Sequence, residues 1–264
     1  MATRNDDGRS AVDRANLLLS LTVSTFLSRL HFPIPSPLSY PVSTFLSRLH
    51  FLPRLHFGPP DAMIDSLLAG NRAFLADEFA AHEAYYQKIA ARQSPKVLWI
   101  GCSDSRVSED LITGSRPGTI FVHRNVANIV AFNDVNIAAT LEYGIVHVKI
   151  RDIVVCGHTR CGGIAAIDGG VRENYIADWL CIASGAKKIV DEIAAKKKLT
   201  TEQRLELLAE ENVRLQIRHL ENLALIKNMR AKKSLPRIHG WLYRVETGKI
   251  DILIDGREAP GKKG

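Results

Sequence analysis

The sequence predicts an α/β protein with a mainly parallel central sheet, helices on both faces of that sheet and a helical N-terminal arm. Two observations support this fold class. Short apolar stretches of strand length alternate with amphipathic stretches of helix length, which is typical of strand–helix–strand units. The chain has 264 residues, of which 46% are hydrophobic and 24% charged, so it is long enough to bury a core.

The helices are predicted from apolar residues that recur at three- and four-residue spacing. Two such stretches in residues 61–93 form the arm. A third begins at the helix-starting residues Asn133 and Asp134, and a short helix at 161–170 ends in two glycines. The last, at 200–233, is predicted as one long amphipathic helix, because Thr200 and Gln203 form a capping box and lysines fill its final turn.

The strands are predicted from short apolar runs bounded by turn residues. The last two runs are close in sequence and are joined by the turn "ETG" at 246–248, which makes them a closing pair of strands. The five runs are 94–101, 118–123, 151–157, 235–245 and 249–255.

Residues 1–60 differ in composition from residues 61–264, and we expect two regions with that boundary. "VSTFLSRLHF" occurs at 23–32 and again at 42–51, with prolines nearby, and no acidic residue lies between Asp13 and Asp61. Such a repeat does not favour a packed core. We expect a disordered or targeting extension. Its Ser/Arg-rich composition resembles a mitochondrial transit peptide, although its early aspartates depart from that pattern, so a mitochondrial or cytoplasmic location is expected.

The composition also bears on partners. The formal net charge is +7, but the basic residues lie in short runs without interleaved aromatic residues, so no nucleic-acid partner is expected. The apolar run at 15–28 is shorter than the roughly 20 residues that a membrane span needs, so no membrane partner is expected. Four cysteines in this length favour metal binding or catalysis over a disulfide scaffold.

Two predicted strands end in residues that can bind a metal. Cys102 follows the first strand, and "GHTRCGG" at 157–163 places His158 and Cys161 after the third. Functional sites of parallel sheets form beyond the carboxyl ends of the strands. Two thiolates and an imidazole suit zinc, and three protein ligands leave a fourth position open for catalysis. A rival interpretation adds Cys156 as a fourth ligand and gives a closed structural site, although one intervening residue would crowd Cys156 against His158.

Asp104 and Arg106 follow Cys102 at alternate positions, so their side chains are expected on one side of the extended chain. Asp104 can accept the proton of a zinc-bound hydroxide and so orient it. Arg106 can hold that carboxylate by a two-pronged hydrogen bond, which keeps it ionised. The alternative is an ordinary salt bridge at a strand end. We expect Cys156 and Cys181 to be buried in the core.

Five motifs together resemble the β-class carbonic anhydrases, over roughly residues 61–255. They are "CSDSR", "HRNVAN" at 123–128, "LEYGIVHV" at 141–148, "GHTRCGG" and "IHGWLYRVETGKI" at 238–250. The resemblance implies one Zn²⁺ per subunit, carbon dioxide and bicarbonate as substrates, and a homodimer or a dimer of dimers. It implies Cys102, His158 and Cys161 as zinc ligands and Asp104 and Arg106 as a catalytic dyad.

One further site residue rests on the same resemblance and has a plain structural alternative. Gln93 matches a pocket glutamine of plant-type members, or it is a surface amide at a helix end. Gly162 and Gly163 would let the chain turn closely around the metal and offer backbone amides to an anion.

Some members of the family close the site at lower pH, with the aspartate as fourth zinc ligand. Three residues here match a bicarbonate pocket of those members: Trp99, Arg124 and Tyr243. Asp104 would then be the fourth ligand of a closed state. The alternative is that all three residues only pack or pair within the fold.

Two other functions stay open from the sequence. An enzyme of the same fold that acts on another small heterocumulene, such as carbon disulfide, would use the same ligands. A non-catalytic zinc protein could bind nucleic acid through its basic surface.

Overall fold

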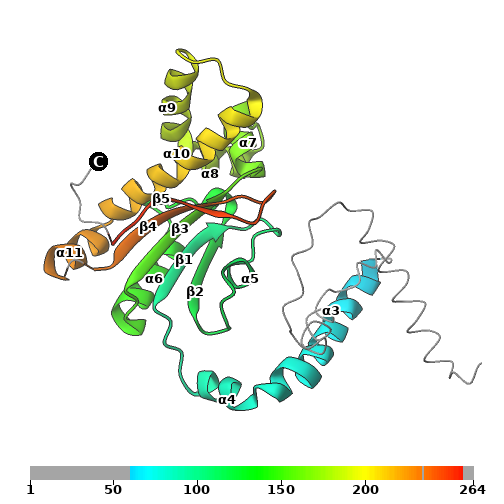
Figure 1. Cartoon of the computed structure of the whole chain (residues 1–264). Helices are drawn as coiled ribbons and strands as arrows, with labels where there is room; N and C mark the ends of the chain where they lie inside the picture. Colours follow the sequence, from blue (N-terminus) through cyan, green and yellow to red (C-terminus); the bar gives the residue numbers. More distant parts are fainter. Residues whose placement is uncertain (1–59, 234, 258–264) are drawn as a thin grey trace, which may run out of the picture. The chain divides into compact units, whose positions relative to one another are not determined.

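The structure is a computed structural model that describes residues 60–233 and 235–257 (Figure 1). The predicted extension lies outside these residues, apart from Pro60. The chain divides into two compact units, one ending at Asp77 and the other beginning at Glu78. Among the described residues, no helix combines the length and the apolarity needed to cross a membrane.

The two helices predicted in residues 61–93 are both present. The first, α3 (Pro60–Phe74), belongs to the N-terminal unit and leads into a π-helical turn, η1 (Leu75–Phe79). Apolar side chains at Met63, Ile64, Leu67 and Leu68 are each more than half exposed. The second, α4 (Glu83–Ala91), belongs to the larger unit, where the Tyr85 hydroxyl donates a hydrogen bond to the Pro117 carbonyl oxygen.

The predicted sheet is confirmed, with all five strands in the order β2-β1-β3-β4-β5. The first three strand pairs, β1 with β2, β1 with β3 and β3 with β4, are parallel, and β4 pairs with β5 in antiparallel register. The parallel arrangement brings the carboxyl ends of β1 and β3 to the same edge of the sheet. The bounds are β1 (Val97–Cys102), β2 (Ile120–Asn125), β3 (Asp152–His158), β4 (Arg237–Tyr243) and β5 (Ile250–Ile254).

Helices cover the two faces of the sheet unequally. On one face, the strand residues Leu98, Ile100, Ile153 and Val155 pack in one buried cluster with side chains of four helical elements. Those helical elements are α6 (Val135–Glu142), η3 (Tyr143–Val148), α10 (Thr201–Asn222) and α11 (Ala224–Lys233). Figure 1 shows α9 beside α10. A second buried cluster joins α10 to three further helices and two short turns. These are α7 (Gly162–Gly169), α8 (Asn174–Leu180) and α9 (Ser184–Ala194), with the 3₁₀ turns η2 (Val126–Asn128) and η4 (Cys181–Ala183).

The opposite face holds a smaller core around Trp99, Val154, Cys156 and Tyr243. Among the described residues that pack there, only Ile112 of the five-residue helix α5 (Glu109–Thr113) comes from an α-helix. The indole of Trp99 lies over Gly101: a Cβ at that position would come within 2.3 Å of the indole nitrogen. A side chain at 101 would therefore displace Trp99.

The predicted helix at 200–233 is one correction. Its capping box at Thr200 and Gln203 is confirmed, but the helix breaks at Leu223, whose ψ of 134° is extended. Leu220 and Ile226 are both fully buried on the two sides of the break. Six residues apart in an unbroken helix, they would point about 120° away from each other. The break lets both side chains face the sheet.

Candidate metal centre

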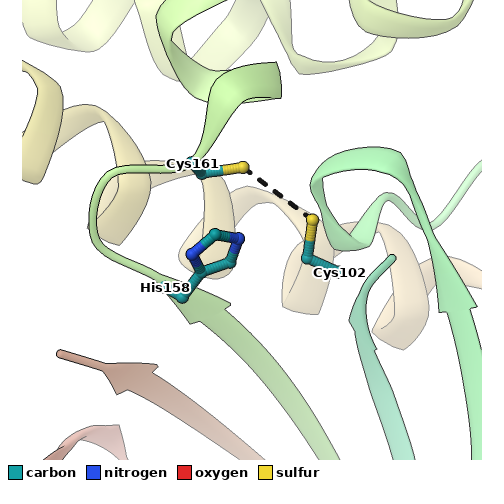
Figure 2. A group of neighbouring side chains, drawn as sticks. All are labelled: Cys102, His158 and Cys161. Carbon is teal, nitrogen blue, oxygen red and sulfur yellow. Dashed lines mark hydrogen bonds between the residues drawn. The ribbon is translucent and has the colours of Figure 1, made fainter. Parts of the chain in front are cut away.

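The three predicted ligands converge where β1 and β3 end. Cys102 is the last residue of β1, His158 the last residue of β3, and Cys161 caps the N-terminus of α7. Figure 2 shows the three side chains turned toward one another across the neighbouring strand ends. Their ligand atoms lie within 4.8 Å of one another, and all three residues are buried.

The distances and the unused lone pair fit zinc. The two sulfur atoms are 3.9 Å apart, and tetrahedral coordination with Zn–S bonds of about 2.3 Å places two sulfurs about 3.8 Å apart. The Nε2 atom of His158 is buried and has no hydrogen-bond partner among the described residues. A buried imidazole nitrogen without a partner is costly unless a ligand such as a metal ion uses its lone pair. The donor set and its spacing therefore suit a zinc ion.

The other nitrogen of His158 fixes which atom can bind. His158 Nδ1 lies 2.8 Å from the Thr159 carbonyl oxygen. A carbonyl can only accept, so Nδ1 must carry the hydrogen and donate it. In the neutral ring, the lone pair is then at Nε2, on the side of the two cysteines.

The two thiols share their protons unequally. The hydrogen bond with Cys161 lowers the pKa of the Cys102 thiol. The same contact with Cys102, together with burial, raises the pKa of Cys161, while backbone amides at Ile164 and Gly163 favour its thiolate. One proton therefore leaves readily, and the second leaves when a cation offsets the second negative charge.

The rival four-ligand site is not formed. Cys156 lies in the core on the opposite face of the sheet, its thiol donates to the Gly157 carbonyl oxygen, and burial raises its pKa. Its burial was predicted correctly. The prediction that Cys181 is also buried is wrong, because Cys181 is exposed at the end of α8 and its thiol donates to the Asp178 carbonyl oxygen.

Asp104 and Arg106 form a bidentate pair beside the ligands. Arg106 Nε donates to Asp104 Oδ1 at 2.9 Å and Nη2 donates to Oδ2 at 2.7 Å. Nη2 also donates to the Arg160 carbonyl oxygen at 3.0 Å. Asp104 Oδ2 is 3.7 Å from His158 Nε2. The hydrogen bonds from Arg106 hold the pKa of Asp104 far below its usual range. The carboxylate is thus ionised and fixed next to the three ligand atoms.

The three residues of the predicted bicarbonate pocket lie in two different settings. Trp99 and Tyr243 pack in the same apolar core. The indole nitrogen of Trp99 has no hydrogen-bond partner among the described residues, although Trp99 is only 1% exposed. Arg124 donates to the backbone carbonyl oxygens of Cys102 and Asp104, and so supports the segment that carries the first ligand and the carboxylate.

The remaining predicted residues lie at or outside the centre. Gly162 and Gly163 form the first turn of α7, directly after Cys161. A Cβ at Gly163 would come within 3.0 Å of Ala127, so this turn approaches the 126–128 segment closely. Gln93 is exposed between α4 and β1, and the contacts within the described residues do not join it to the ligands.

Sequence analysis missed the role of Thr159 and Arg160, which lie inside the ligand motif. They act through backbone carbonyl oxygens, one toward His158 and one toward Arg106. Arg160 also has a positive φ of 55°. Residue type at these two positions gives no signal for a carbonyl contact. The only indication of these backbone contacts in the sequence was the short turn between His158 and Cys161, which are three residues apart.

Comparisons with known proteins identify the family to which the chain is similar. Residues 97–250 match the family described as carbonic anhydrase. The chain is 34% identical over 196 residues to a carbonic anhydrase of Emericella nidulans, covering 72% of this chain and 84% of that protein. A carbonic anhydrase of Pseudomonas aeruginosa is also 34% identical, over 193 residues, with 71% and 86% covered.

Solved structures give the same result. One from Sordaria macrospora, described as a tetrameric β-carbonic anhydrase, superposes with a TM-score of 0.69 at 34% identity and covers 73% of this chain and 97% of its own. A β-carbonic anhydrase of Aspergillus fumigatus has a TM-score of 0.68 at 31% identity, with 75% and 93% covered. The family model spans more than half of the chain, and its matched region contains all three converging side chains. The chain therefore belongs to the β-carbonic anhydrase family.

Proposed function

We propose that this protein is a zinc-dependent carbonic anhydrase, which interconverts carbon dioxide and bicarbonate. The buried cluster of Cys102, His158 and Cys161 is the observation that carries the proposal. Three protein ligands leave one position for water, as catalytic zinc sites require. When bound, zinc lowers the pKa of a water ligand to about 7 and so supplies hydroxide at neutral pH.

The three side chains would hold the ion in a site of defined charge. Two thiolates and a neutral imidazole together balance the two charges of Zn²⁺. Because Nδ1 donates to the Thr159 carbonyl, the lone pair that would bind the ion is at Nε2. The site is buried, which keeps bulk water from competing with the ligands.

Asp104 and Arg106 orient the attacking oxygen. The ionised Asp104 carboxylate is an acceptor only, so it can take the hydrogen bond of the nucleophile and leave a lone pair directed at the substrate carbon. Arg106 prevents the carboxylate from turning, since two parallel hydrogen bonds fix its plane. Carbon dioxide is small and uncharged, so orientation of the nucleophile matters more than recognition of substrate groups.

We also infer that the protein works as a homo-oligomer, as a homodimer or a dimer of dimers. The tetrameric description of the Sordaria macrospora relatives supports this. Exposed apolar side chains at Phe132, Val135 and Tyr175, which are 60% to 90% exposed, are compatible with a buried subunit interface.

Stopped-flow measurement of carbon dioxide hydration tests the proposed activity. The zinc-loaded protein should accelerate hydration, a strong chelator should abolish the acceleration, and added Zn²⁺ should restore it. Carbon disulfide hydrolysis by the same preparation is the comparison for the related heterocumulene activity. A preparation that binds zinc but hydrates carbon dioxide no faster than buffer contradicts the proposal, and salt-sensitive nucleic-acid binding would then favour the non-catalytic alternative.

The bicarbonate pocket leads to a separate prediction, which rests on the unpartnered indole N–H of Trp99. If bicarbonate accepts a hydrogen bond from this group and favours a closed state with Asp104 on the metal, bicarbonate should deepen the loss of activity below about pH 8. Trp99→Phe keeps a ring in the core and removes the N–H, so it should weaken the effect of bicarbonate. The ratio of hydration rates with and without bicarbonate, measured across pH, checks this. An unchanged ratio leaves Trp99 as a packing residue.

A further inference from the structure

Thr159, the residue after the histidine ligand, uses all of its polar groups in hydrogen bonds. Its backbone N–H donates to the Tyr243 carbonyl oxygen at 3.0 Å, which extends the β3–β4 pairing by one residue. Its carbonyl oxygen accepts from His158 Nδ1 at 2.8 Å. Its hydroxyl accepts from the Val245 N–H at 3.0 Å and donates to Glu246 Oε2 at 2.6 Å. With only 4% of its surface exposed, Thr159 is held on three sides.

These contacts connect Glu246 to the metal centre through one residue. Glu246 lies in the turn between β4 and β5, far from the ligands in sequence. Its carboxylate receives a charge-assisted hydrogen bond from the Thr159 hydroxyl, and such bonds are about twice as strong as neutral ones. The same hydrogen bond lowers the pKa of Glu246, so the carboxylate is ionised at neutral pH.

The direction of the Thr159 carbonyl depends on this anchoring. A peptide plane at a strand end can rotate unless both its side chain and its neighbours are fixed. Threonine is branched at Cβ, so it has a stiff χ1 and transmits the position of its hydroxyl to its backbone. If the carbonyl turned away, Nδ1 of His158 would lose its acceptor, and the ring would no longer be held with Nε2 toward Cys102 and Cys161.

We propose that Thr159 and Glu246 are positioning residues of the metal centre: Glu246 holds the Thr159 hydroxyl, and the Thr159 carbonyl holds the His158 ring in the orientation that binds the ion. This inference rests on the proposed zinc site and adds a second layer to it. The two residues act on metal binding through His158 and do not touch the reacting atoms.

The surroundings of this pair supply a matched control. Thr159 and Glu246 line a cavity of about 390 Å³ together with Arg160 and Glu202. Glu202 pairs with Arg160 at 3.0 Å in the same cavity. The hydrogen bonds of the Thr159 side chain go to Val245 and Glu246 instead. Removing the Glu202 carboxylate therefore changes the charge of the cavity and leaves the contacts of Thr159 in place.

The experiment compares four variants of the full chain: Thr159→Val, Thr159→Ser, Glu246→Ala and Glu202→Ala. Zn²⁺ affinity is measured by competition with a chromophoric chelator, ligand geometry by the visible spectrum of the Co²⁺-loaded protein, and folding by thermal unfolding of the metal-free protein. Thr159→Val and Glu246→Ala should weaken Zn²⁺ binding by about 10- to 100-fold and change the Co²⁺ spectrum, as loss of an outer-layer partner does. Thr159→Ser, which keeps the hydroxyl, and Glu202→Ala should resemble the unmodified protein in both measurements.

The outcomes separate this inference from the proposed function. If Thr159→Val and Glu246→Ala fold and keep the original affinity and spectrum, the positioning role is refuted while the zinc site stands. If Thr159→Val does not fold, Glu246→Ala alone decides, because the Glu246 side chain is 35% exposed and belongs to none of the three buried apolar clusters. If Glu202→Ala weakens zinc binding equally, the effect is one of general charge and the specific chain of contacts is wrong. If the unmodified protein binds no zinc, the proposed function itself fails.

Discussion

Replacing Cys102, His158 or Cys161 with alanine should remove zinc and carbonic anhydrase activity together, which is the largest effect that we expect from any single substitution. The three ligand atoms lie within 4.8 Å of one another, so each can supply one of the three bonds from the protein to the ion. Two remaining ligands do not hold zinc tightly at neutral pH. Metal content should fall from one ion per subunit to about one tenth or less, and kcat/KM by about a thousandfold or more. Metal analysis and stopped-flow hydration measure both.

Cys156→Ala is the matched control for these variants. Cys156 is also a buried cysteine near the end of β3, but its side chain lies in the core on the other face of the sheet. Its loss should lower stability modestly, because it removes a buried thiol from a packed core, and should leave zinc content unchanged. Full activity in Cys102→Ala, His158→Ala or Cys161→Ala would overturn the ligand assignment. Zinc loss in Cys156→Ala would revive a four-ligand site.

Asp104→Ala should keep zinc and lose most of the activity, the second largest effect that we expect. The carboxylate lies beside the ligand cluster, with Oδ2 3.7 Å from His158 Nε2, and is paired with Arg106. In the proposed mechanism, its loss would leave no ionised acceptor to orient the nucleophile. Positioned acid–base groups contribute about 10²- to 10⁴-fold to rates, and we expect kcat/KM to fall within that range. Arg106→Ala should act in the same direction, because it frees the carboxylate to turn.

The chain offers a control of the same local geometry. Asp255 and Arg257 form the same two-residue arrangement, in which the arginine Nε and Nη2 both donate to the carboxylate. This second pair lies after β5 and lines a different cavity, with Asp152 and His239. Asp255→Ala should therefore leave hydration unchanged. Zinc loss in Asp104→Ala would instead identify Asp104 as a permanent ligand and contradict an open metal site.

The Asp–Arg arrangement occurs at 104 and 106 and again at 255 and 257, but only the first pair lies beside the three ligands. The spacing Asp-x-Arg produces a bidentate pair in both places, so the spacing alone predicts local geometry and not function. A function is proposed at Asp104 and not at Asp255, because Cys102 precedes Asp104 at a strand end and a second strand ends in His158. Parallel strands bring such ends together, and the ligand types then select the metal. The convergence of the two thiols and the imidazole could therefore be predicted without coordinates.

Other features depend on packing that the sequence does not display. The apolar spacing of the helix at 200–233 continues through Leu223, so the break that orients both Leu220 and Ile226 was not predictable. Cys181 was predicted as a buried residue on the basis of residue type, but it lies at the exposed end of α8. The part played by Thr159 was hidden for another reason, since its contact with His158 is made by a backbone carbonyl that every residue has.

Because the ligands lie on neighbouring strands, the free energy of unfolding and the cellular abundance of the protein would depend on zinc. Cys102 and Cys161 are 59 residues apart in sequence, and only the folded sheet brings their sulfurs together. The unfolded chain therefore cannot offer the complete set, and zinc would bind the native state more tightly than the unfolded chain. Such a ligand raises the free energy of unfolding by about 2.7 kcal/mol when its free concentration is 100 times its Kd, and by about 4.1 kcal/mol at 1,000 times. Differences of 1–2 kcal/mol change cellular abundance several-fold. Zinc supply would then set how much of this protein escapes degradation, in addition to how much of it is active.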